Sequence, residues 1–89
     1  MSRFVGGSAG AMAREIAEGF IIVTQNTLRR FAPEELRQLQ FEIDRLLTAL
    51  RAEQSPTDDP LTVQKRNRKI SRLTQVAHLI QALLQQRRG

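Results

Sequence analysis

The chain has 89 residues, of which 40% are hydrophobic and 26% are charged, and it contains no cysteine. This composition is typical of one small folded domain, and the lack of cysteine excludes disulfides and thiolate metal sites. No apolar run approaches the roughly 20 residues of a membrane-spanning helix, so no membrane span is expected. We expect a cytoplasmic protein.

The net charge of +5 is unevenly distributed along the chain. Residues 1–59 carry seven basic and nine acidic side chains, whereas residues 60–89 carry seven basic side chains and no acidic one. The positive excess therefore lies in the last third of the chain. A segment of this kind favours a polyanion or an acidic protein as partner.

The N-terminal part is predicted to contain one helix over residues 9–30. Residues 1–8 form an expected flexible lead, because Gly6 and Gly7 disfavour regular structure and Ser8 is a suitable cap. The β-branched run 21–24 would also suit a buried strand, but no second strand is available to pair with it. Apolar side chains at three- and four-residue steps favour the helix: Met12, Ile16, Phe20 and Val23.

The second predicted helix spans residues 33–53. Pro33 suits a first helical turn, and Glu34 and Glu35 complement the N-terminal helix dipole. Its apolar residues follow the spacing of a coiled-coil seam, which Leu47 widens: Leu36, Leu39, Ile43, Leu46 and Leu50.

The third predicted helix spans residues 60–86 and begins with the cap and first-turn pair Asp59 and Pro60. Its apolar stripe contains Val63, Ile70, Leu73, Ala77, Ile80 and Leu84, with Val76 and Leu83 on its border. The short loop at 54–58 requires this helix to pack antiparallel to the one before it. The sequence thus predicts an all-α single domain over residues 9–89, with a helical hairpin.

The residues that catalysis requires are scarce. There is one histidine, no cysteine, tyrosine or tryptophan, and no acid or histidine spacing that would hold a metal. His78 falls outside the apolar stripe and is expected to be exposed or at its boundary. We expect a protein that is not an enzyme and has no cofactor or metal.

The basic ridge is defined as Lys65, Arg68, Lys69 and Arg72. A solvated helix face usually mixes charges of both signs, but no acid balances these four. Lys and Arg release counterions from nucleic acid and grip phosphate oxygens. No aromatic residue is interleaved with them, so contact with the backbone is predicted and base stacking is not. Arg66 falls within the apolar stripe and is expected to pair across the hairpin with Glu42, Asp44 or Glu53.

Residues 33–80 resemble the two-helix protein of the large ribosomal subunit near the exit tunnel, the twenty-ninth in the bacterial naming. The resemblance rests on Asp59-Pro60-Leu61-Thr62-Val63, on Arg68-Lys69-Ile70-Ser71-Arg72-Leu73 with Val76, and on the helix that opens at Glu34-Glu35-Leu36-Arg37. The first 30 residues have no counterpart in that family, and Leu46–Arg51 lacks its aromatic segment. The resemblance implies that the ridge faces RNA rather than DNA.

Two functions compete at this point. One is a helical module whose ridge binds RNA or DNA backbone. The other is a homo-oligomeric, coiled-coil-like adaptor, most simply a homodimer, because the apolar residues exceed what one hairpin covers. The expected oligomer interface consists of Ile16, Phe20, Val23 and Phe41.

Overall fold

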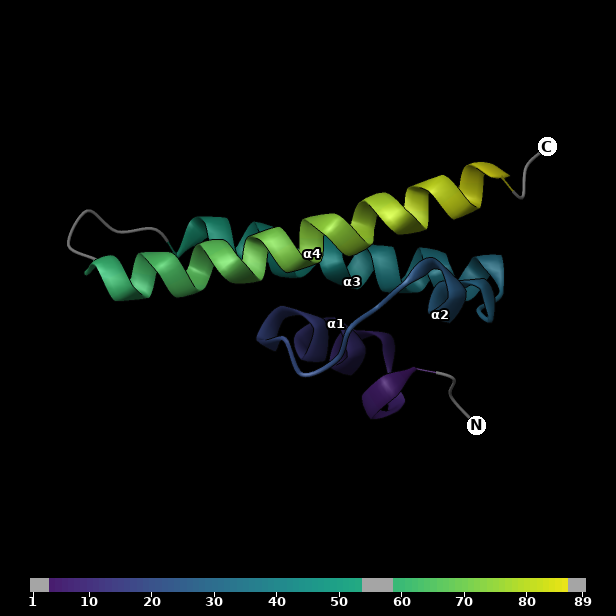
Figure 1. Ribbon diagram of the computed structural model, residues 1–89, viewed down its shortest axis with the longest axis horizontal. Coiled ribbons are helices and arrows are strands. Elements are labelled where there is room, and N and C mark those ends of the chain that lie inside the picture. Colours follow the sequence, from purple (N-terminus) through teal and green to yellow (C-terminus); the bar gives the residue numbers. More distant parts are fainter. Residues whose placement is uncertain (1–3, 54–58, 87–89) are drawn as a thin grey trace.

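The computed structural model describes residues 4–53 and 59–86, and all regular structure within these ranges is helical, which confirms the predicted all-α class. The elements are η1 (Val5–Gly7), α1 (Ala9–Glu18), α2 (Gln25–Arg29), α3 (Pro33–Ala52) and α4 (Pro60–Gln86). Figure 1 shows α3 and α4 side by side and running in opposite directions, which is compatible with the predicted hairpin. The shorter α1 packs against both of them, and α2 packs against α4.

The single helix predicted over residues 9–30 is wrong, because the chain leaves α1 at Gly19 and resumes helix only at Gln25. Gly19 adopts a left-handed conformation with φ of 78°, and its N–H bonds the Ile16 carbonyl. The N–H of Phe20 bonds the Glu15 carbonyl at 3.0 Å, which completes a Schellman-type helix end. The β-branched run that follows disfavours a new helical turn until Thr24 caps α2 through the Thr27 N–H.

The predicted helix starts are confirmed by their caps. The Ser8 hydroxyl accepts a hydrogen bond from the Ala11 N–H at 3.1 Å, and the Asp59 carboxylate accepts one from Thr62 at 2.7 Å. Pro33 occupies the first turn of α3, and the Glu35 carboxylate accepts the N–H of Ala32 at 2.7 Å. Each bond satisfies an N–H that a helix start leaves without an intrahelical acceptor.

The buried face of α4 is rotated relative to the predicted stripe. The buried residues are Arg66, Leu73, Val76, Ile80 and Leu83. Val63, predicted to be in the stripe, is 37% exposed, and Ile70, Ala77 and Leu84 are only partly buried. Val63 belongs to the first turn of α4, and the first turns of this helix extend beyond the end of α3 in Figure 1. On α3 the prediction is closer, since Leu47 is buried and Leu46 is partly buried.

One hydrophobic core joins α1, α3 and α4. Met12, Leu36 and Leu73, one from each helix, are fully buried in it. The predicted lead, 1–8, is described from residue 4 onward. Its Phe4 ring packs edge-on against Phe31, with 5.4 Å between ring centroids, and η1 follows directly. The loop expected at 54–58 lies outside the described residues.

Candidate nucleic-acid interface

The basic ridge lies along α4 and divides into two pairs. Lys65 and Arg68 are exposed and make no hydrogen bond or ion pair with another described residue. Lys69 and Arg72, further along the helix, contact the C-terminal end of α1. The first pair is therefore fully available to a partner, whereas the second pair is shared with α1 but keeps part of its surface exposed.

Lys69 and Arg72 supply α1 with the positive charge that its own last turn lacks. The Lys69 ammonium lies 2.9 Å from the Glu18 carboxylate, and the Arg72 guanidinium donates to the Ala17 carbonyl at 2.9 Å. The last turn of α1 contains no basic residue. Because a helix C-terminus carries partial negative charge and carbonyls without intrahelical donors, these two side chains stabilise it.

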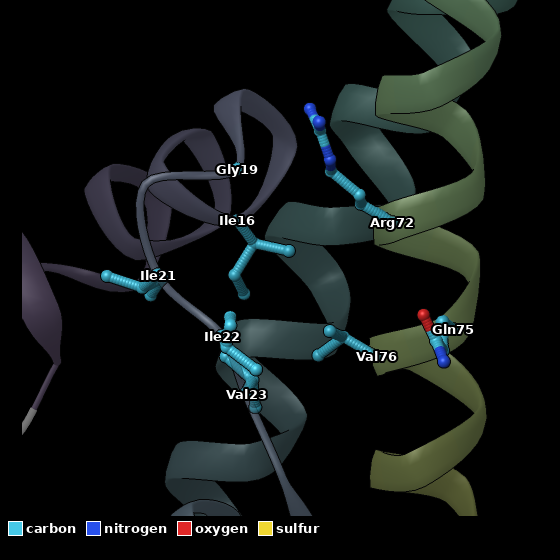
Figure 2. A pocket seen from close by; sticks show the side chains of 8 residues that line it. All are labelled: Ile16, Gly19, Ile21, Ile22, Val23, Arg72, Gln75 and Val76. Carbon is cyan, nitrogen blue, oxygen red and sulfur yellow. The ribbon is translucent and has the colours of Figure 1, made fainter.

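The Arg72 guanidinium lies directly against Gly19. A Cβ atom added to Gly19 would be 2.8 Å from the central carbon of the guanidinium, closer than side chains pack. Figure 2 shows Arg72 reaching from α4 toward the turn at Gly19. The glycine is thus needed both for its left-handed backbone and for the close approach of the arginine.

A hollow of about 230 Å³ lies below this contact, between α1, the segment that follows Gly19, and α4. Ile16 and Val76 point into it from the two helices, and Arg72 and Gln75 add polar groups at its edge (Figure 2). Ile22 also lines it, although 88% of this residue is exposed. The hollow is smaller than the roughly 300–1,000 Å³ of ordinary ligand sites, so it fits a single side chain or part of a ligand.

Arg66 is buried, as its position in the apolar stripe predicts. Its guanidinium donates to the backbone carbonyl of Glu53 at 3.4 Å and thereby ties α4 to the end of α3. Arg66 is therefore a structural residue, separate from the basic ridge.

The four residues expected at an oligomer interface do not form one surface. Ile16 is 2% exposed and belongs to the core of its own chain, and Val23 is partly buried. Phe20 and Phe41 are 73% and 59% exposed. Phe41 lines a separate depression, between the start of α1 and α3, while Ile16 and Val23 line the hollow beside Arg72.

His78 is exposed, as expected. The described residues contain no group of three or more His, Cys, Asp or Glu side chains that could hold a metal ion. The N–H of Thr62 lowers the pKa of the Asp59 carboxyl below its ordinary value, as a helix cap does. No helix in the described part of the chain is sufficiently long and apolar to cross a membrane.

Comparisons of the chain with protein-family models, with characterised proteins and with solved structures found no match. The resemblance to the ribosomal protein therefore stays a prediction. Two features of the candidate interface were not predicted from the sequence: the contact between Gly19 and Arg72 and the exposure of Phe20. Gly19 and the four β-branched residues at 21–24 were the available signal for the helix end. The residue that contacts this helix end, Arg72, lies more than 50 residues further along the chain.

Proposed function

We propose that the protein is a non-enzymatic helical module that binds nucleic-acid backbone, RNA in preference to DNA, through the basic ridge. The observation that carries this proposal is the exposure of Lys65 and Arg68 on a helix that has no acidic residue. Two neighbouring cations of this kind, one turn apart on a rigid helix, match a phosphate backbone better than a mixed-charge surface does.

The acids that face the ridge do not cancel its charge. Glu18 pairs with Lys69, and Asp59 acts on Lys65 from the start of α4. No ion pair of Arg68 or Arg72 is observed among residues 4–53 and 59–86, and Arg72 keeps an exposed side chain while one of its nitrogens is bound to α1. Long-range attraction of a polyanion requires this net positive field rather than any single contact.

The structure also decides which variant tests the proposal. Removing all four ridge charges would release the C-terminal end of α1, so loss of binding could follow from loss of structure. The double variant Lys65→Gln with Arg68→Gln avoids this, because neither residue forms a hydrogen bond or ion pair with α1 in the described structure and Gln keeps a helix propensity close to that of Lys and Arg.

The measurement is the affinity for a fluorescein-labelled single-stranded RNA, followed by fluorescence anisotropy at low salt. We expect the double variant to bind at least tenfold more weakly than the parent protein. The matched control is Arg14→Gln with Arg37→Gln, an exposed pair that lines the separate depression beside Phe41 and carries the same charge. Equal losses for the two double variants would indicate attraction by net charge alone and would contradict a site on the ridge.

A second candidate is a self-associating adaptor, most simply a homodimer. It is favoured by the exposed large apolar residues: Phe20, Ile22, Phe41, Leu61 and Val63. Leu61 and Val63 lie on the overhanging start of α4, where another chain could cover them. Sedimentation equilibrium in the absence of nucleic acid tests this candidate, since a monomer at high micromolar concentration would contradict it.

A further inference from the structure

The structure brings an exposed aromatic residue, Phe20, to the turn that packs against the basic ridge, although the two are far apart in the sequence. Phe20 is 73% exposed and follows Gly19, against which the Arg72 guanidinium packs. We propose that the ridge takes single-stranded nucleic acid and that an unpaired base stacks on Phe20. This inference rests on the proposed function and names its substrate class.

The geometry fits one nucleotide with its base and phosphate held by neighbouring groups. The Cα atoms of Gly19 and Phe20 are about 3.8 Å apart, as in any trans peptide. Phe20 is therefore within one residue of the Arg72 guanidinium. A phosphate at Arg72 and Arg68 would leave its base within reach of the ring. The ridge alone could bind any phosphate backbone, whereas the ring requires a base that is unpaired.

The backbone that carries the ring is held in place. The N–H of Phe20 bonds the Glu15 carbonyl at 3.0 Å, and the contact of Arg72 with the Ala17 carbonyl fixes the same helix end. A ring on an ordered backbone loses less conformational entropy on binding than one on a mobile loop. Phe20 is therefore better suited to stacking than a residue on a mobile loop would be.

The surroundings of the ring supply further contacts for a base. Ile22 is 88% exposed and offers apolar surface two residues away, and Gln75 carries an amide at the edge of the adjacent hollow. An amide can both donate to and accept from a base edge. The alternating exposure of Phe20, Ile21, Ile22 and Val23 places the two most exposed side chains of the segment on the solvent side.

Phe41 provides the contrast. It is 59% exposed, but the Arg45 guanidinium lies over its ring at 5.7 Å from the centroid, and Arg45 in turn pairs with Glu42 at 3.3 Å. The face of that ring is thus occupied by a cation, and a carboxylate beside it repels phosphate. Phe41 is therefore the matched control for Phe20 within the same chain.

The test compares Phe20→Leu with Phe41→Leu, because leucine keeps an apolar side chain while removing the aromatic face. Affinities are measured by fluorescence anisotropy for labelled single-stranded oligouridine and for the duplex that it forms with oligoadenosine. Phe20→Leu is expected to weaken single-strand binding roughly 5- to 100-fold, which corresponds to about 1–3 kcal/mol. Duplex affinity and the salt dependence of binding are expected to stay unchanged, and Phe41→Leu is expected to leave both affinities intact.

Three outcomes would overturn the stacking proposal. The first is a Phe20→Leu variant that binds single strands as tightly as the parent while both retain salt-dependent binding, which would leave the proposed function standing. The second is binding to phosphatidylserine vesicles that survives in Phe20→Leu and is lost in Phe20→Ala, which would assign the exposed residues to a lipid surface. The third is a dimer that persists in Phe20→Leu and dissociates in Phe20→Ala, which would assign the exposed residues to an interface with a second copy of the chain.

A parent protein that binds neither oligouridine nor its duplex would contradict the proposed function itself. That result is distinguishable from a failure of stacking alone, in which the charges still bind and only the single-strand preference is missing. Single-stranded DNA of matching sequence serves as a further arm, since stacking on Phe20 acts on either sugar, and its affinity is expected to fall with the same substitution.

Discussion

Replacement of Gly19 by alanine tests the contact that joins α1 to the ridge. The residue needs a left-handed backbone, which costs an L-amino acid about 1–2 kcal/mol. Alanine also restricts the unfolded chain, which offsets about 0.4–1 kcal/mol of that cost. The new methyl group must in addition displace the Arg72 guanidinium, because its carbon would lie 2.8 Å away. The lost bond from the exposed Arg72 to the buried Ala17 carbonyl is worth about 0.5–1 kcal/mol.

The expected destabilisation is therefore about 1–2 kcal/mol, against a total free energy of unfolding of about 5–13 kcal/mol for a chain of this size. Urea unfolding followed by far-UV circular dichroism measures it. Gly7→Ala is the matched control, because Gly7 also has a positive φ, of 93°, but no atom lies within 4 Å of the position its Cβ would take. We expect Gly7→Ala to cost about 1 kcal/mol, since only the left-handed backbone and the restricted unfolded chain contribute there.

A double-mutant cycle isolates the contact. In an Arg72→Ala background the guanidinium is absent, so Gly19→Ala is expected to cost only as much as Gly7→Ala. Strictly additive costs for Gly19→Ala and Arg72→Ala, together with equal costs at Gly19 and Gly7, would refute the account of this contact.

Two further predictions concern the core and the start of α4. Leu73→Ala, at a fully buried position, is expected to lower the free energy of unfolding by about 2–5 kcal/mol. Leu61→Ala, at a position 59% exposed, is expected to change it by less than about 0.5 kcal/mol. Equal losses for the two variants in urea unfolding would contradict the packing described. Asp59 stabilises the fold above its unfolded-state pKa, and this stability is lost as pH falls through its lowered folded pKa. Asp59→Ala is therefore expected to make the free energy of unfolding fall less steeply as the pH is lowered into the acidic range. The same dependence on pH in the parent and the variant would show that the cap contributes nothing.

The sequence predicted helix starts more accurately than the helix end inside the N-terminal segment. Ser8, Glu35 and Asp59 form bonds with groups three residues away, so local chemistry is sufficient to identify them. The end of α1 depends both on Gly19 itself and on Arg72, which reaches it from α4. The hydrophobic periodicity of Met12, Ile16, Phe20 and Val23 continued through the glycine and concealed the break.

The candidate site could be predicted only in part for the same reason. The four ridge residues lie on one helix, and their spacing alone placed them on neighbouring faces. Their division into an anchored and an available pair depends on α1, which approaches α4 only in the folded chain. Phe20 lies 52 residues from Arg72 in the sequence, so periodicity could not bring it to the ridge, and base stacking was not predicted.

The salt dependence of affinity tests the central claim, binding of a nucleic-acid backbone by the ridge, most directly. Affinity for single-stranded RNA is measured between about 50 and 200 mM salt for the parent protein and for Lys65→Gln with Arg68→Gln. If four phosphates are contacted, the slope of log affinity against log salt is about −3 for the parent and about −1.5 for the double variant. The same slope for both proteins, or no dependence on salt in the parent, would contradict the account.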